Sequence, residues 1–415
     1  MKAKLSTWGA RQCAPLIICL IAMMTMAACG SEGEDINSIN KQTILVYMPW
    51  SGSTSSAGLY NYFLANLDSI ESGIKAKGGL TDNRVMIFIS ESASNSVLYE
   101  LTYDSQSQEC VRTKIKEYDG HDYTTAEGIT NILTDVKNLA PALNYAMMIG
   151  CHGTGWTFTD SWERYPYYAK AFSLFEDVDE QAAHQTRFFG SVSDLSFSTN
   201  ISTLAQGIEG AGLKMQYIMF DDCYMANVEV AYELRNATNF LIASTSEVMV
   251  IGFPYQTMWK SLGKWTPDYA SAISAFGTFY AKYEAPYGTA SAIDCREMDN
   301  LASIMKLIND KYPSLGEEDF KSLQVLDGFD EPIFFDFGDY VEKLCRENAL
   351  NNRIKSSLNV LIKAKSNTDQ IYSNLYGEGK FIDVNTFSGI TISDPSQNSV
   401  AQKSLTHTSW YQATH

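Results

Sequence analysis

The sequence predicts an α/β fold in which a mostly parallel sheet is covered by helices on both faces. Short apolar runs rich in β-branched and aromatic residues recur along the chain, and segments with an apolar residue every three or four positions separate them. This alternation is typical of parallel strands joined by helices. The apolar runs are continuous rather than alternating, which indicates strands buried on both faces.

Five runs predict the strands of this sheet, and they cover residues 43–50, 84–90, 143–150, 215–220 and 240–245. Helical periodicity predicts the connecting helices, with apolar positions at 59, 63, 67, 70 and 74 and further helices over 129–139, 201–208 and 225–234. Residues 99–118 alternate loosely, so we expect a hairpin at the edge of the sheet.

The pattern continues less regularly after residue 265. It predicts helices over 269–282, 301–308 and 337–344, and extended chain at 291–294 and 389–392. No segment rich in Pro, Gly or Ser separates this part from the rest, so we expect residues 266–415 to pack on the same core as residues 43–265.

Composition excludes some classes of protein. Of the 415 residues, 45% are hydrophobic and 19% charged, which is ordinary for a globular chain and excludes wholesale disorder. The formal net charge of −17 repels phosphate backbones, so we expect no nucleic-acid partner.

Residues 1–28 predict a signal peptide that exports the chain. Lys2, Lys4 and Arg11 form a basic leader, an apolar run follows, and two alanines precede Cys29. This order resembles a bacterial lipoprotein signal, which implies a lipidated Cys29 at the mature N-terminus, a polar tether over 29–42 and membrane attachment through the lipid. We therefore expect a lipoprotein of the cell envelope. We expect it in the outer membrane, and exposure at the cell surface is a further option. The alternative is an ordinary signal peptide with an incidental cysteine.

The cysteines of the mature chain after Cys29 are few and scattered: Cys110, Cys151, Cys223, Cys295 and Cys345. Their number is odd and no CxxC pair occurs, so the sequence predicts neither a zinc site nor a disulfide scaffold. We expect no cofactor, and the sequence leaves a calcium requirement open.

Two predicted strands deliver reactive side chains at their carboxyl ends, where sites form in open parallel sheets. His152 follows the third strand and Cys223 follows the fourth. A thiol beside an imidazole supplies the attacking thiolate of thiol hydrolysis. The backbone N–H groups of Gly153 and of Cys223, at the start of the next predicted helix, can hold an oxyanion.

Each of these residues also has a purely structural interpretation. A cysteine after a strand is often a small buried apolar residue, and His-Gly often forms a turn. Cys151 competes for the role of nucleophile. Side chains alternate along an extended strand, so Cys151 and His152 are expected to face apart, and we interpret Cys151 as structural.

Two segments carry a resemblance to a known family. ALNYAMMIGCHGTGW is similar to the histidine segment of the clostripain family of cysteine peptidases, and LKMQYIMFDDCYMANVEVAYEL is similar to its cysteine segment. The resemblance extends from about residue 43 to the C-terminal end. It implies a caspase- or haemoglobinase-like fold with a C-terminal α/β extension, His152 as general base and Cys223 as nucleophile, and peptide or protein substrates.

The family's Arg- or Lys-directed members use acidic residues to bind the basic side chain before the cleaved bond. Asp221 matches one such position, which implies cleavage after Arg or Lys; alternatively, Asp221 caps the following helix. The segment 157–197 lacks periodicity and is either a processing loop, cut at Arg164, Lys170 or Arg187, or a plain surface insertion. The rival function is a non-catalytic surface lipoprotein that binds peptide or glycan on a peptidase-like scaffold.

Overall fold

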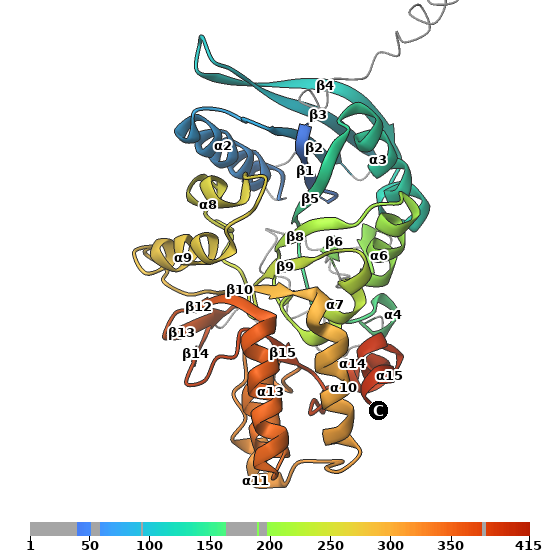
Figure 1. Cartoon of the computed structure of the whole chain (residues 1–415), viewed down its shortest axis with the longest axis vertical. Helices are drawn as coiled ribbons and strands as arrows, with labels where there is room; N and C mark the ends of the chain where they lie inside the picture. The colour runs from blue at the N-terminus through green and yellow to red at the C-terminus, as the bar shows by residue number, and fades with distance from the viewer. Residues whose placement is uncertain (1–39, 51–58, 93, 163–188, 191–196, 376–378) are drawn as a thin grey trace, which may run out of the picture. The chain divides into compact units, whose positions relative to one another are not determined.

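A nine-stranded sheet forms the centre of the structure, in the order β12-β10-β9-β8-β5-β1-β2-β3-β4 (Figure 1). Its strands are β1 (Asn40–Met48), β2 (Asn83–Ser92), β3 (Asn95–Asp104), β4 (Glu109–Asp119), β5 (Ala142–Gly150), β8 (Met215–Asp221), β9 (Phe240–Ala243), β10 (Thr289–Asp294) and β12 (Ile362–Asn367). The five central strands, β9, β8, β5, β1 and β2, are parallel. The strands at both edges are antiparallel, and β3 and β4 form the predicted hairpin. The prediction of a mostly parallel sheet is confirmed.

This computed structural model describes residues 40–50, 59–92, 94–162, 189–190, 197–375 and 379–415. The predicted signal peptide 1–28, Cys29, the tether as far as residue 39 and most of the segment 157–197 lie outside the described residues. Asn40–His415 forms one structural unit. Among the residues described, no helix combines the length and the apolar character needed to cross a membrane.

Helices cover both faces of the sheet, as predicted. On one face lie α2 (Tyr60–Lys77), α8 (Tyr255–Leu262) and α9 (Tyr269–Tyr280), and on the other α3 (Ala126–Leu139), α6 (Ile201–Gly210) and α7 (Val228–Glu233) (Figure 1). The central strands accordingly contain continuous apolar runs; in β1, all five residues from Ile44 to Met48 are buried. A strand buried on both faces needs such a run because neither side of it meets water.

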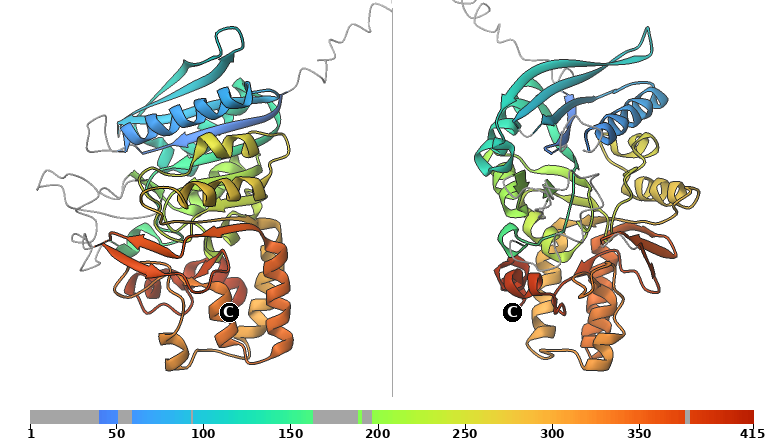
Figure 2. Two further views of the ribbon diagram at one scale, coloured as in Figure 1. Left: turned by 90° about the vertical axis from the view of Figure 1, so that its left-hand side faces the viewer. Right: turned by 180° about the vertical axis from the view of Figure 1, so that it is seen from behind.

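The chain after β10 adds helices and short strands beside β12. The helices are α10 (Met298–Asn309), α11 (Glu317–Lys321), α12 (Phe337–Leu344), α13 (Asn348–Leu361), α14 (Ser399–Ser404) and α15 (Ser409–Thr414), and α4 (Thr159–Trp162) lies earlier in the chain. Three small sheets pair β6 (Phe189–Gly190) with β7 (Ser198–Thr199), β11 (Phe335–Asp336) with β15 (Thr391–Ile392), and β13 (Gln370–Ser373) with β14 (Lys380–Asp383). Figure 2 shows α10 and α13 side by side beyond the β12 edge of the sheet.

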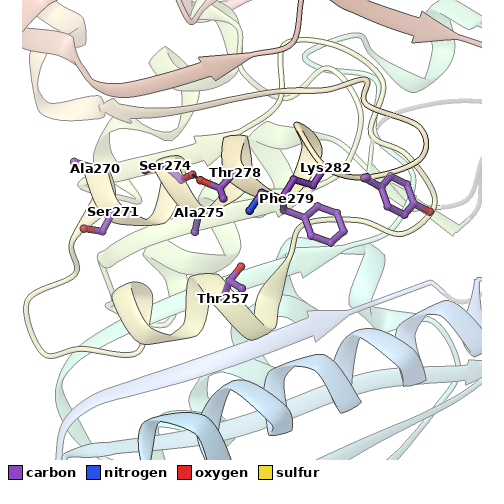
Figure 3. Close-up of a pocket in the computed structure, with 9 residues that line it drawn as sticks. Thr257, Ala270, Ser271, Ser274, Ala275, Thr278, Phe279 and Lys282 are labelled. Atoms are coloured by element: carbon purple, nitrogen blue, oxygen red, sulfur yellow. Dashed lines mark hydrogen bonds between the residues drawn. The ribbon is translucent and has the colours of Figure 1, made fainter.

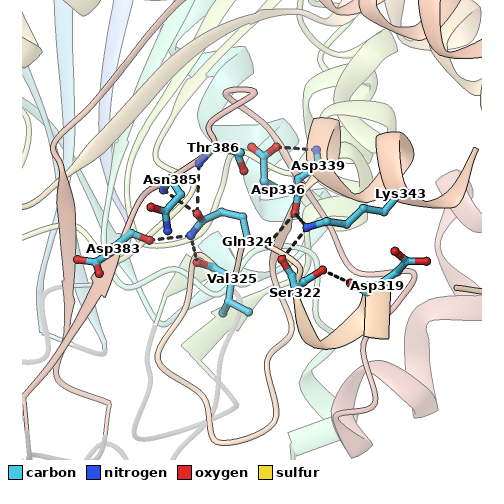
Figure 4. A network of polar contacts seen from close by, with 10 residues as sticks. All are labelled: Asp319, Ser322, Gln324, Val325, Asp336, Asp339, Lys343, Asp383, Asn385 and Thr386. Atoms are coloured by element: carbon cyan, nitrogen blue, oxygen red, sulfur yellow. Dashed lines mark hydrogen bonds and ion pairs between the residues drawn. The ribbon is translucent and has the colours of Figure 1, made fainter. Parts of the chain in front are cut away.

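Gln324 ties together several loops of this C-terminal part (Figure 4). Its Nε2 donates to the carbonyl oxygens of Val325 and Asp383, both at 2.9 Å, and its Oε1 accepts the N–H of Asn385 at 2.8 Å. Its own N–H donates to the Asp339 carboxylate at 2.8 Å. A largely buried amide with its donors and acceptors engaged in this way fixes the loops that it joins.

The C-terminal strand β15 packs against the segment that precedes α7. The Thr391 N–H donates to the Ala226 carbonyl at 3.0 Å, and the Ser393 N–H donates to the Glu229 carboxylate at 2.8 Å. Trp156 Nε1 donates to Ser393 Oγ at 2.8 Å. Strand β15 therefore contacts the chain that follows Cys223, and Ser393, directly after β15, contacts the chain that follows His152.

The next residue, Asp394, has a buried carboxyl group whose oxygens find no hydrogen-bond partner within the described residues. Burial raises the pKa of Asp394 to about 7. The pKa of Glu229 is also raised, first by burial and then by Asp394. The folded chain therefore holds a proton on Asp394 that the unfolded chain releases near pH 4, and the resulting stabilisation is lost as the pH rises through about 7.

We expect Asp394→Asn to flatten the pH dependence of stability. Between pH 4 and pH 7, ionisation of buried Asp394 should lower the free energy of unfolding of the wild type by up to about 4 kcal/mol. The variant should not show this loss. Urea unfolding at several pH values measures this difference, with Glu318→Gln as the control at an exposed acid. Identical pH profiles for the wild type and Asp394→Asn would contradict this prediction.

Candidate active site

The register of two neighbouring parallel strands positions the candidate catalytic residues. Gly150 at the end of β5 lies opposite Asp221 at the end of β8. His152 and Cys223 each lie two residues beyond this pair. Both line one cavity of about 110 Å³, whose wall is formed by Leu59, Tyr62, Phe63, Asn66, Cys151, His152, Asp221, Asp222, Cys223, Glu247, Val248, Met249, Val250 and Gly252.

The loop that carries His152 packs directly on the backbone of Cys223. A Cβ added at Gly153 would lie 2.7 Å from the Cys223 carbonyl oxygen and 3.1 Å from the Cys223 nitrogen. Glycine is therefore required here for a close approach of two backbones. The carbonyl of His152 also accepts the Gly190 N–H at 3.1 Å, which ties the histidine loop to β6.

Cys223 is only partly exposed, and its sulfur accepts the Val248 N–H at 3.3 Å. Burial, followed by the charge of Glu247, raises the pKa of the Cys223 thiol well above its usual range. The neutral thiol is therefore the favoured form in the chain without substrate.

Tyr224, the residue after Cys223, has a left-handed backbone with φ of +61°. A bulky residue adopts this conformation only where its surroundings impose it. The Tyr224 ring stacks on Phe334 at 5.0 Å between centroids, and its hydroxyl donates to Glu247 at 2.8 Å. Glu247 also accepts hydrogen bonds from the Ser373 hydroxyl and, at 3.2 Å, from the Asn374 N–H. These contacts fix the direction in which the chain leaves Cys223.

Cys151 lies in the same cavity wall, although we expected it to face away from His152. Its N–H and its thiol both donate to the Asp222 carboxylate, at 2.6 and 3.4 Å. Burial and Asp222 raise the pKa of the Cys151 thiol well above its usual range. Cys151 thus serves to link the histidine loop to the cysteine loop.

Asp221 is buried in the cavity wall. Its Oδ1 accepts the Phe253 N–H at 2.8 Å, and its Oδ2 lies 3.4 Å from the side-chain nitrogen of Asn66. A Cβ added at Gly252, where φ is +73°, would lie 2.4 Å from Oδ2. Burial raises the pKa of this carboxyl to about 6.

Two expectations about the helix after Cys223 are wrong. Helix α7 begins at Val228, not near residue 225, and its N-cap is Asn227, which accepts the Val230 N–H at 2.8 Å. Asp221 therefore does not cap this helix, and the N–H of Cys223 is not at a helix start. Ala226 and Asn227 are held as extended chain: the Ala226 N–H donates to the Ser244 carbonyl at 2.8 Å, and Asn227 bridges to Thr391 with φ of −127° and ψ of 161°. The helix can therefore start only after Asn227.

Sequence reasoning missed Glu247 and the wall that α2 contributes, namely Leu59, Tyr62, Phe63 and Asn66. One signal was present for the wall: a helix that follows the first strand starts at the carboxyl edge of the sheet, beside the site. No comparable signal marked Glu247, because the partners that identify it come from distant parts of the chain.

A larger hollow of about 860 Å³ lies between α8 and α9 (Figure 3). Its lining residues are Thr257, Ala270, Ser271, Ser274, Ala275, Thr278, Phe279, Lys282 and Tyr283. The described residues of its lining include no His or Cys, whereas both line the smaller cavity, which is therefore the better candidate active site. Within the described residues, no group of three or more His, Cys, Asp or Glu is arranged to hold a metal ion.

We expect Gly153→Ala to impair catalysis, because the added methyl group forces the histidine and cysteine loops apart. A misplacement of this kind lowers kcat by roughly tenfold to a hundredfold. Gly150→Ala, at the end of the preceding strand β5, is the matched control, since its Cβ would meet only ordinary contacts at 3.7 Å or more. Equal activity of the two variants would show that the close approach at Gly153 is not needed.

Comparison with known proteins identifies relatives along almost the whole described chain. The family model of the clostripain family, Peptidase_C11, matches residues 46–414. A secreted C11 cysteine protease from Bacteroides thetaiotaomicron, "iotapain", is 43% identical with a TM-score of 0.80, and the match covers 91% of this chain and 99% of that protein. A clostripain from B. thetaiotaomicron ATCC 29148, solved with a peptide inhibitor, is 49% identical over 55% of this chain and 99% of its own, with a TM-score of 0.52.

An inactive zymogen C11 protease from Parabacteroides distasonis is 24% identical, with a TM-score of 0.70. The match covers 90% of this chain and 98% of that protein, and it supports the fold. Among curated proteins, none matches the chain significantly. The resemblance seen in the two sequence segments is thus confirmed by a family match that spans most of the chain. The chain belongs to the clostripain family of cysteine peptidases and is a hydrolase with the caspase-like fold of that family.

Proposed function

We propose that the chain is an endopeptidase with a His152–Cys223 dyad. The observation that supports this most directly is the shared cavity, which His152 and Cys223 enter from the ends of two strands in register. The Cys223 sulfur attacks the peptide carbonyl, and the tetrahedral intermediate collapses to a thioester as the amine departs. Water then attacks the thioester and releases the acid product.

His152 is the proton carrier in this proposal. Because burial and Glu247 favour the neutral thiol, a base must remove the Cys223 proton during attack, and His152 is the base at hand. The same imidazolium then protonates the leaving amine. The N–H groups of Gly153 and Cys223 are the proposed oxyanion donors. The close approach of their two backbones supports this proposal, whereas a helix terminus does not contribute to it.

The dyad is tested by comparing two cysteine variants. We expect Cys223→Ala to lower kcat/KM by at least about a thousandfold, because the nucleophile is lost. Cys151→Ala should retain most activity with reduced stability, since its thiol only bridges to Asp222. Peptide hydrolysis and thermal unfolding of both variants measure these effects. The opposite ranking of the two activities would move the nucleophile to Cys151.

We further propose that the enzyme cleaves after Arg or Lys, with Asp221 binding the basic side chain. Asp221 is a buried carboxylate in the cavity wall, and the described residues that line this cavity include no Lys or Arg. A cation in a partly desolvated pocket gains from a charge-assisted hydrogen bond. The inhibitor bound to the 49% identical relative has the sequence VLTK, which ends in lysine and is consistent with this proposal.

Asp221→Asn should remove the preference for Arg and Lys. A charge-assisted hydrogen bond contributes on the order of 1.5–3 kcal/mol, so selectivity should fall roughly tenfold to a hundredfold. In the wild type, KM for a lysine substrate should rise as the pH falls through about 6, because protonation neutralises Asp221. This rise should vanish in Asp221→Asn. A peptide library profiled at several pH values measures both effects, and a wild-type preference for apolar or acidic residues at this position would refute the proposal.

We also propose that the chain is exported and attached to the outer membrane through a lipid on Cys29. The support is the order of basic, apolar and small residues before Cys29. The 43% identical relative is described as secreted, which agrees with export. A peptidase attached in this way meets peptides outside the cytoplasm.

A further inference from the structure

Three large apolar side chains stand exposed around the mouth of the active-site cavity. Tyr62 is 44% exposed, Val250 is 59% exposed and Ile251 is 41% exposed. Tyr62 and Val250 line the cavity itself, and Ile251 lies between two of its lining residues, Val250 and Gly252. We call these three residues the apolar rim. Single exposed apolar residues are common, but a group at the edge of a cleft indicates a binding surface.

Val250 and Ile251 are also unusual choices for their place in the backbone. They are the central residues of a turn closed by a hydrogen bond of 2.7 Å from the Gly252 N–H to the Met249 carbonyl. Turn centres favour Gly, Pro, Asn, Asp and Ser, and β-branched side chains are stiff there. Because both side chains are exposed, packing does not compensate for this choice. Such departures from local preference are typical of functional positions.

The chain segments that carry the rim are connected to the buried Asp221. Gly252 packs on the Asp221 carboxylate, and the N–H of the following Phe253 donates to that carboxylate at 2.8 Å. On the opposite wall, Asn66 approaches Asp221 at 3.4 Å, and Tyr62 lies one helical turn before Asn66 on the same face of α2. Both sides of the mouth are therefore anchored to Asp221.

We propose that the apolar rim selects substrates with a bulky apolar residue within the two positions that precede the basic residue at the cleaved bond. This inference rests on the proposed function, because it requires a basic side chain directed at Asp221. With that side chain in the cavity, the preceding residues lie at its mouth. There, the rim removes an apolar side chain from water. The substrate class is then peptides with an apolar-basic sequence.

The test uses a peptide library with Arg or Lys fixed at the cleaved bond and the two preceding positions varied. Apolar contacts in a specificity site discriminate by roughly tenfold or more, so the wild type should favour Leu, Val or Phe over Gly, Ser or Asp by that factor in kcat/KM. Val250→Ser/Ile251→Ser should reduce the preference to about threefold or less, mainly through KM. Tyr62→Gln should act in the same direction.

Leu143→Ser is the matched control. Leu143 is 58% exposed, almost as much as Val250, but it lies at the amino end of β5, away from the site. This variant should keep the wild-type preference. The turn variant should unfold at the wild-type temperature, which shows that its fold is intact.

Two results would overturn the inference: a wild type without apolar preference, or a turn variant that retains the preference in full. A second library, with apolar residues fixed and the basic position varied, tests the proposed function separately. If the wild type shows no preference for Arg or Lys there, the assignment of Asp221 fails. If it prefers Arg or Lys but ignores the preceding residues, only the role of the rim fails.

Discussion

The parallel register between β5 and β8 is the constraint on which the site depends. Because Gly150 lies opposite Asp221, both strands end at the same level and both reactive residues follow at equal distance. A shift of one residue would turn every side chain of one strand to the other face of the sheet and separate the pair. The hydrogen bonds from Cys151 to Asp222 and the contact of Gly153 with Cys223 extend this register beyond the last paired residues.

The site surrounds one thiol with three buried acids, which is costly unless each acid has a partner. Asp222 is engaged by Cys151, and Glu247 by Tyr224, Ser373 and Asn374. Asp221 accepts the Phe253 N–H on one oxygen, its other oxygen lies 3.4 Å from the Asn66 side-chain nitrogen, and the Tyr255 hydroxyl also bonds this carboxyl. Each of the three acids thus has a hydrogen-bond partner, which offsets the cost of its burial.

The sequence predicts the fold well and places His152 and Cys223 at the same edge of the sheet, because both predictions follow from local patterns. Continuous apolar runs gave the central strands, and the carboxyl-end rule brought His152 and Cys223 together. The start of α7 was not predictable in the same way. Its apolar pattern reaches back to residue 225, but the left-handed Tyr224 is imposed by Phe334 and Glu247, and Asn227 then supplies the cap. Glu247 itself acquires its place from Ser373, 126 residues later, which no local pattern records.

Residues after 266 support the two loops that follow His152 and Cys223. Phe334 touches the two at once: its ring stacks on Tyr224, and a Cβ at Gly155 would meet it at 2.8 Å. Asp327 holds the Phe334 loop by accepting the N–H groups of Ile333 and Phe334 at 2.8 and 2.6 Å, which offsets the cost of its own burial. On the other side, β15 pairs with the chain after Cys223. The positions of the loops at the ends of β5 and β8 thus depend on contacts made by the last third of the chain.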